Sequence, residues 1–249
     1  MIDLKDVKNL SDKEKLDILF KYVINTEIGR GRLLEEVFER QSGLKDDDIH
    51  HYDASRLYQF MIKLFGYNEK PKVISNEKFK DLDAPILYRG VRKQEHAQNL
   101  INGDDYHYGA GTQYDGLYSS KEKRIASSYG NFIFKMKLSE DAKVSKVVYL
   151  LDDWYYRNTH KSYDKEKREK AQTLVDFIKC IKSKTQRELF MYIFSKDRTT
   201  LLIYLGFDAL IKINGDYVIF NRGKIVFSER EYNKISKTIK KESDEQTLE

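Results

Sequence analysis

Apolar residues in the first part of the chain recur at helical spacing. Their steps of three and four residues predict three helices before residue 70. The first is predicted to begin at a capping box, in which Ser11 and Glu14 each bond the other's backbone N–H. The third is predicted to begin after Asp53 as its cap. The three apolar stripes are Leu16, Leu19, Phe20 and Val23; Leu33, Leu34, Val37 and Phe38; and Leu57, Phe60, Met61 and Leu64. Residues 1–70 are therefore predicted to form a helical N-terminal subdomain.

After Pro71 the apolar spacing shortens towards two, as expected for strands whose successive side chains face opposite ways. Strands are predicted at 85–90, 131–138 and 144–150, and the second of them places Phe132, Phe134, Met136 and Leu138 on one face. Residues 152–205 return to helical spacing, and we interpret them as a helical insertion. Within it we predict a stripe formed by Leu174, Phe177, Ile178 and Ile181, a capping box at Thr185 and Glu188, and a helix stop at Gly206.

The last part of the chain predicts three short strands, separated by Asn214-Gly215 and Arg222-Gly223, two dipeptides typical of tight turns. We expect these strands to form a compact antiparallel sheet. A final helix is predicted from about Glu229 to Lys241, followed by a disordered tail at 242–249. The chain as a whole is predicted to be an α+β protein, with a second domain over 71–241 that carries the 152–205 insertion.

Composition narrows the classes of function without selecting one. The 249 residues are 40% hydrophobic, enough for a globular core, and the net charge of +5 permits an anionic ligand or a nucleic acid. Cys180 is the only cysteine, which excludes a disulfide framework and a cysteine-based zinc site and favours a reducing cytoplasm. No apolar run reaches the roughly 18 residues of a membrane span, and the charged start does not resemble a signal peptide. We therefore expect a cytoplasmic protein with no membrane partner.

Three places carry side chains that suggest chemistry. Arg89 closes a predicted strand just before Gly90, a glycine-rich loop leads into a short strand at Tyr118, and Asp216 begins a strand after a tight turn. Each also has a purely structural interpretation. A strand-terminal arginine often forms a surface ion pair, a strand tyrosine is often core, and an aspartate at a turn often bonds the turn backbone. Only their combination and order favour a shared site.

That order resembles the ADP-ribosyltransferase superfamily, the NAD-consuming fold of bacterial toxins, phage enzymes and poly-ADP-ribose polymerases. The resemblance covers about residues 72 to 228. The family's aromatic-Arg-Gly motif is matched at 88–90, its Tyr/Ser strand and following helix by "GLYSSKEKRIASSYG", and its acid-led strand by "DYVIFN". "GFDAL" is similar to phage-borne members. The resemblance implies a split antiparallel β-sandwich and a catalytic triad of Arg89, Tyr118 (or Ser119) and Asp216, in which Asp216 departs from the usual glutamate.

The resemblance also implies a function: transfer of ADP-ribose, a glycosyl group, from NAD as co-substrate to a protein or nucleic acid, without a metal. A toxin role with an antitoxin or a phage partner is a further implication. In such a site Asp216 would stabilise oxocarbenium character on the ribose, Arg89 would clamp the dinucleotide and Tyr118 would stack on nicotinamide. The alternatives are an NAD glycohydrolase and a catalytically degenerate binding module. The residues expected to hold NAD are Arg89, Gly90, Tyr108, Tyr118, Ser119 and Tyr129.

Other polar residues compete for these roles. Glu229 and Glu231 resemble the double-glutamate motif of arginine-modifying transferases, but with Ser228 they also form a capping box, the interpretation we favour. The choice of catalytic carboxylate between Asp216 and this pair stays open. We expect Asp208 to bond the backbone and His107 to be an ordinary loop histidine. One further segment has the residue types of a metal site, but we favour its interpretation as a solvated loop; its residues are Asp46, Asp47, Asp48, His50 and His51.

Overall fold

The computed structural model describes residues 7–25, 51–102, 116–146, 165–196 and 198–246. Several predictions lie outside these residues: the apolar stripe at 33–38, the acidic run at 46–48, His50, His107 and Tyr108. The chain divides into two compact units. One, here the helical unit, comprises Met1–Gly66, Thr112–Asp115 and Val148–Gly206; the other, the sheet unit, comprises Tyr67–Gly111, Gly116–Val147 and Phe207–Glu249. The segment predicted as an insertion thus belongs to the same unit as the N-terminal helices.

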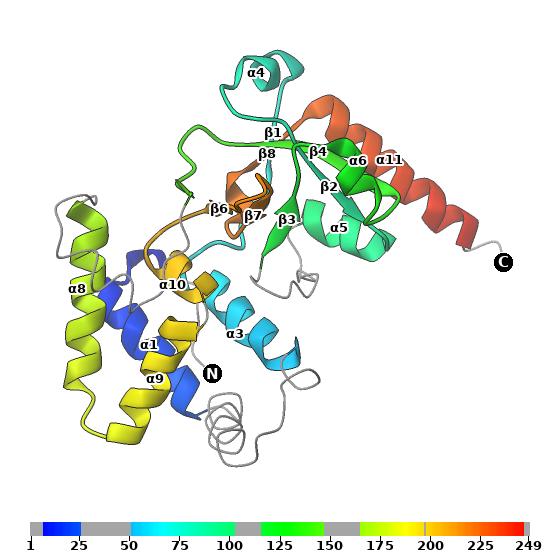
Figure 1. Ribbon diagram of the computed structural model, residues 1–249. Coiled ribbons are helices and arrows are strands. Elements are labelled where there is room, and N and C mark those ends of the chain that lie inside the picture. The colour runs from blue at the N-terminus through cyan, green and yellow to red at the C-terminus, as the bar shows by residue number, and fades with distance from the viewer. Residues whose placement is uncertain (1–6, 26–50, 103–115, 147–164, 197, 247–249) are drawn as a thin grey trace. The chain divides into compact units, whose positions relative to one another are not determined.

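The helical unit is built on the predicted apolar stripes. A short 3-10 turn, η1 (Val7–Asn9), precedes α1 (Asp12–Asn25), and α3 (His51–Leu64), α8 (Lys165–Cys180), α9 (Lys184–Lys196) and α10 (Arg198–Tyr204) follow. Figure 1 shows α1, α8 and α9 side by side. Leu16, Leu19 and Val23 are buried, and the Phe20 ring packs edge-on against Phe190, with 5.5 Å between centroids. Apolar burial therefore holds the helices together.

The helix ends of this unit test the capping predictions. The first capping box is confirmed, since Ser11 N donates to Glu14 Oε2 at 2.8 Å and Glu14 N donates to Ser11 Oγ at 3.3 Å. The other two predicted caps are wrong. α3 already includes Asp53, and α9 begins after Ser183, whose Oγ accepts from Gln186 N at 3.4 Å. A serine that bonds the third residue on caps as well as a threonine, so local sequence could not choose between Ser183 and Thr185. Gly206, with φ of 84°, ends α10 as predicted.

The sheet unit contains two small mixed sheets. The first has the strand order β1 (Lys72–Ile74), β8 (Ile225–Ser228), β4 (Phe132–Leu138), β2 (Leu87–Val91). The second has the order β3 (Leu117–Ser119), β7 (Tyr217–Ile219), β6 (Ala209–Ile211), β5 (Val144–Ser145). The α+β class is confirmed. The prediction of purely antiparallel sheets is wrong, because β1 pairs with β8 and β5 pairs with β6 in parallel.

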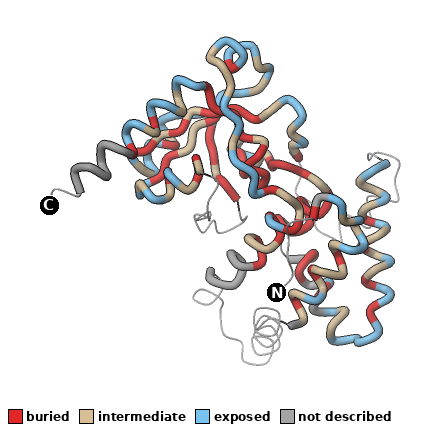
Figure 2. Tube along the Cα trace, turned by 180° about the vertical axis from the view of Figure 1, so that it is seen from behind, coloured by how far each residue is buried: buried red, intermediate tan, exposed pale blue. Residues whose placement is uncertain are grey.

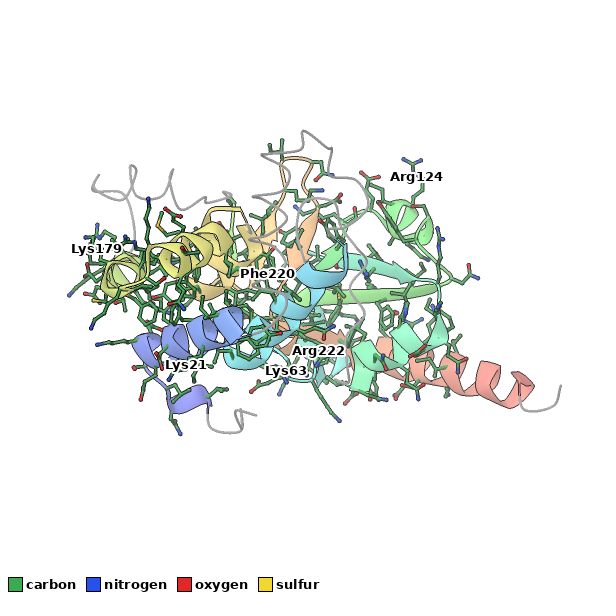
Figure 3. All side chains as sticks on the ribbon, turned by 90° about the horizontal axis from the view of Figure 1, so that it is seen from below. Lys21, Lys63, Arg124, Lys179, Phe220 and Arg222 are labelled. Carbon is green, nitrogen blue, oxygen red and sulfur yellow. The ribbon has the colours of Figure 1, made fainter. Side chains whose placement is uncertain are left out.

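The three final strands do not form one sheet, contrary to the prediction. Asn214-Gly215 does join β6 and β7 as an antiparallel hairpin. At Arg222-Gly223, however, the chain forms a 3-10 turn, η2 (Arg222–Lys224), and crosses to the other sheet. The Arg222 side chain, labelled in Figure 3, is buried and donates to the carbonyl oxygens of Glu69 and Asn68. These bonds at the sheet crossing replace the hairpin that the dipeptide predicted.

One apolar core joins both sheets of this unit. The four predicted inward residues of β4 are all buried, and the second sheet contributes Leu117 and Ile219 to the same core. Helices α5 (Gln94–Asn102) and α11 (Glu229–Gln246) complete it with Leu100, Ile235 and Ile239. Figure 2 shows the buried positions concentrated along the strands and the exposed positions along the outer sides of the helices. Two shorter helices, α4 (Asn76–Asp81) and α6 (Lys123–Ser127), also belong to this unit.

The last helix begins at Glu229, as predicted, but continues to Gln246. Residues 242–246, assigned from the sequence to a disordered tail, are therefore helical. In none of the described ranges does a helix have both the length and the apolar character needed to cross a membrane.

An ion pair on the sheet unit gives a test of pH dependence. Lys224 Nζ donates to Asp141 Oδ2 at 2.6 Å and Ser139 Oγ donates to Oδ1 at 2.6 Å; together they lower the pKa of Asp141 from 3.8 to about 2. The ionised Asp141 carboxylate should stabilise the folded state fully above pH 3.8, and this stabilisation should be lost as the pH falls towards 2. The Asp141 side chain is 65% exposed, so solvent screening limits the effect to less than about 1 kcal/mol.

We therefore expect Asp141→Asn to lower the free energy of unfolding slightly at pH 7 and not at pH 2, as measured by urea denaturation at both values. An equal loss at both would mean that the variant acts through something other than charge.

Candidate functional site

The three motif segments lie on neighbouring backbone strands of the sheet unit. β3 pairs with β7, with Tyr118 opposite Val218 and Ser119 opposite Tyr217. Beyond β3 the chain bridges to β2, where Tyr88 N donates to Ser120 O at 2.7 Å and Ser120 N donates to Tyr88 O at 2.9 Å. Segments about 30 and 100 residues apart in sequence are thus joined by backbone hydrogen bonds.

Arg89 is held by the second motif segment. It lies opposite Phe134 in the pairing of β2 with β4 and is half-buried. Its Nη1 donates to the carbonyl oxygen of Tyr118 at 2.8 Å. This bond fixes the guanidinium beside β3, because a charged donor forms a stronger hydrogen bond than a neutral one. The predicted association of Arg89 with the Tyr118 segment is therefore present in the structure.

The Tyr118 ring is in contact with a lysine that the sequence did not single out. Lys212 Nζ lies 5.2 Å from the centre of the half-buried ring, a cation–π distance. Lys212 follows β6, and its N–H donates to Asp216 O at 2.8 Å across the hairpin. The available signal was its place four residues before Asp216, just ahead of the Asn214-Gly215 turn. One ring face is thus already covered by an ammonium group, so a stacking nicotinamide would use the other face or displace Lys212.

Asp216 lies at the hairpin turn. Its Oδ2 accepts from Asn214 Nδ2 at 2.8 Å, and its N–H donates to Asn214 Oδ1 at 3.2 Å. Because strand side chains alternate, Asp216 is on the same face of the sheet as Val218, and hence as the paired Tyr118. The turn interpretation and the site interpretation therefore both apply to this carboxylate.

Gly90 has a packing role that differs from the one expected. A Cβ at Gly90 would lie 1.9 Å from the carbonyl oxygen of Ala126 in α6. Glycine is thus required because α6 packs directly on β2. On this side of the strand α6 fills the space beside Gly90, and the expectation that Gly90 helps to hold NAD stays a prediction. A Cβ at Gly130, whose φ is 155°, would likewise lie 2.2 Å from the carbonyl oxygen of Val91.

The remaining residues that were predicted to hold NAD differ in how far they are exposed. Ser119 is buried, and its Oγ has no hydrogen-bond partner among the described residues. Tyr129 follows α6 and is 62% exposed. Tyr108, as noted, lies outside the described residues.

Asp208 and the start of α11 have the structural roles predicted for them. Buried Asp208 accepts from Lys143 N at 2.7 Å and from Asn221 Nδ2 at 2.6 Å, which confirms that it bonds the backbone. Glu231 N donates to Ser228 Oγ at 3.3 Å at the start of α11, which confirms the helix cap. Glu229 is exposed.

These observations define what the site offers. A guanidinium on β2, an aromatic ring on β3 and a carboxylate in the turn just before β7 come from three segments that are linked by backbone hydrogen bonds. Over the described ranges, no three acidic, histidine or cysteine side chains are grouped so as to hold a metal ion. Comparisons of this chain with protein families, with characterised proteins and with solved structures found no match.

Proposed function

We propose that this protein is an NAD-dependent mono-ADP-ribosyltransferase that modifies a protein or a nucleic acid. The observation that supports the proposal best is the backbone linkage of β2, β3 and β7, in which Arg89 donates to the Tyr118 carbonyl. Three motifs that are remote in sequence need this proximity in order to act on one ligand. The toxin role and a phage or antitoxin partner follow from the resemblance alone, and the cytoplasmic location follows from composition; all three remain predictions.

The chemistry assigns a role to each side chain. The bond between nicotinamide and ribose breaks, its electron pair leaves with nicotinamide, and positive charge develops on the sugar. The Asp216 carboxylate stabilises that charge, and the acceptor's nucleophile then bonds the same carbon and gives up its proton to that carboxylate. Arg89 offers charge-assisted hydrogen bonds to phosphate or ribose oxygens of NAD. Transfer to water by the same steps gives NAD hydrolysis.

Two contacts favour a second candidate, a module that binds NAD or a related ligand without turnover. Lys212 covers one face of the Tyr118 ring, and Asn214 occupies one oxygen of Asp216. A site held in this state would recognise its ligand and leave the nicotinamide bond intact. Turnover separates the two candidates, because only the transferase releases nicotinamide.

The test is release of labelled nicotinamide from NAD by wild type and by Arg89→Lys. We expect release by wild type and a loss of about tenfold or more in Arg89→Lys, because lysine cannot reproduce the planar paired donors. Arg124→Lys is the matched control, since Arg124 is exposed and points outward from α6 in Figure 3. NAD binding by calorimetry without nicotinamide release would support the binding module instead. If nicotinamide is released, mass spectrometry of cellular RNA and protein after expression would identify the acceptor.

A further inference from the structure

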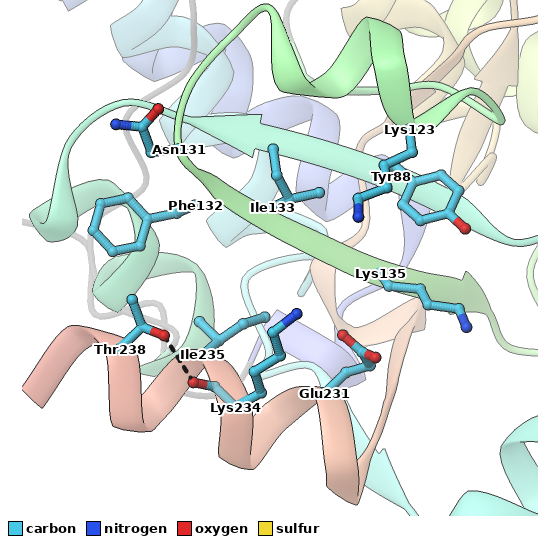
Figure 4. A pocket seen from close by; sticks show the side chains of 10 residues that line it. All are labelled: Tyr88, Lys123, Asn131, Phe132, Ile133, Lys135, Glu231, Lys234, Ile235 and Thr238. Carbon is cyan, nitrogen blue, oxygen red and sulfur yellow. Dashed lines mark hydrogen bonds between the residues drawn. The ribbon is translucent and has the colours of Figure 1, made fainter.

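A pocket of about 380 Å³ lies in the sheet unit, between β4, α6 and the first turns of α11. None of the motif residues Arg89, Tyr118 or Asp216 lines it. Figure 4 shows its lining, with Lys123 extending from α6 and Lys234 from α11 towards Ile133 of β4. The lining residues are Tyr88, Lys123, Asn131, Phe132, Ile133, Lys135, Glu231, Lys234, Ile235 and Thr238. Its size lies in the range of small-molecule sites.

The pocket is on the other side of β2 from the proposed NAD site. Tyr88 and Arg89 are consecutive on this strand, so their side chains face opposite ways. Tyr88 pairs with Lys135, and both line the pocket, whereas Arg89 pairs with core residue Phe134 and bonds the Tyr118 carbonyl. A ligand in the pocket would therefore not occupy the position of NAD.

The charge of the pocket indicates an anionic ligand. Three ammonium groups, those of Lys123, Lys135 and Lys234, face one carboxylate, that of Glu231. In the described part of the chain, none of these three lysines forms an ion pair within 4.0 Å. Lysine binds phosphate as a compact charge with several donors. The hydroxyl groups of Tyr88 and Thr238 add neutral hydrogen-bonding capacity.

The apolar part of the lining indicates that the ligand carries an organic group as well as a negative charge. Phe132, Ile133 and Ile235 form apolar walls, and the half-buried Tyr88 adds an aromatic ring. Aromatic side chains of this kind support planar bases in many nucleotide sites. We propose that this pocket binds an organic phosphate of the nucleoside-phosphate class, with phosphate at the lysines and the base and sugar on the apolar walls.

The test uses uridine 5′-diphosphate, which is not a fragment of NAD. In protein with labelled isoleucine δ1 methyl groups, we expect saturable NMR shifts of Ile133 and Ile235, with uridine and inorganic pyrophosphate each at least about tenfold weaker. If pyrophosphate bound equally tightly, the proposal that the apolar walls bind the nucleoside would be wrong. If uridine bound equally tightly, the proposal that the lysines bind phosphate would be wrong. Shifts confined to other isoleucines, or none at all, would overturn the pocket.

Variants that replace pocket lysines by neutral glutamine test where the phosphate of the ligand binds. Lys135→Gln combined with Lys234→Gln should raise the dissociation constant of uridine 5′-diphosphate about tenfold or more. Lys237→Gln is the matched control, because Lys237 is exposed on the same helix and does not line the pocket. The methyl signal of core residue Ile219, which should not move, verifies that each variant is folded. Unchanged affinity in the double variant, or an equal loss in Lys237→Gln, would contradict the proposal.

Discussion

Asp216→Asn is expected to lower the rate of nicotinamide release from NAD by about 10² to 10³-fold, the cost of removing one electrostatic stabiliser of a transition state. Asparagine keeps the size of the side chain and its capacity to bond the hairpin, where Asp216 now accepts from Asn214. What it removes is the negative charge that opposes the developing positive charge on the ribose. The loss should therefore appear in kcat more than in KM, and radiolabelled NAD gives both.

The other two carboxylates provide the controls for this prediction. Glu229→Gln and Glu231→Gln should change the rate little, because Glu229 is exposed and Glu231 is in the first turn of α11, where its N–H donates to Ser228. Loss of activity in Glu231→Gln with retention in Asp216→Asn would transfer the catalytic role to the double-glutamate pair. Retention in all three would leave none of these carboxylates as the catalytic group.

Asp208→Ala is expected to destabilise the sheet unit by about 3 kcal/mol or more. The buried carboxylate accepts from Lys143 N and Asn221 Nδ2, and Asn221 Oδ1 in turn accepts from Gly223 N. Alanine would remove the acceptor of a buried donor, Asn221 Nδ2, and of a part-buried donor, Lys143 N, at about 1 to 3 kcal/mol for each. Urea denaturation followed by circular dichroism measures the change in the free energy of unfolding.

The control for this prediction is a second aspartate of the same unit. Asp141→Ala removes a carboxylate whose side chain is 65% exposed, so the expected loss is below about 1 kcal/mol. Asp208→Asn should fall between the two, since its amide oxygen still accepts from one donor. A loss in Asp208→Ala no larger than that in Asp141→Ala would show that the buried network does not contribute to stability as its geometry indicates.

The elements best predicted from the sequence are those with a strong local cause. The stripe of Phe132, Phe134, Met136 and Leu138 is buried as expected, because alternation on a strand follows from backbone geometry alone. The Ser11 capping box and the Gly206 stop depend on contacts within a few residues. The cap interpretation of Glu231 succeeded for the same reason.

The elements poorly predicted depend on distant partners. Arg222-Gly223 has the sequence of a hairpin turn, yet the buried Arg222 bonds the carbonyls of Asn68 and Glu69 and the chain passes to the other sheet. Nothing near Arg222 in sequence specifies those acceptors. The close approach of α6 to Gly90 was likewise not predictable, because Ala126 is far along the chain. Lys212 was missed because a cation–π contact needs the ring and the ammonium in space.

The sequence by itself indicated the main helices and strands, which of their faces are apolar, and which arginine, tyrosine and aspartate are candidates for one site. Only the tertiary structure decided that β2, β3 and β7 are neighbours, that Arg89 and Tyr88 face different sides, and that three lysines line a pocket. The physical reason is the range of the forces. Helical and strand periods and caps are properties of adjacent residues, whereas strand order and side-chain clusters arise when the whole core is buried at once.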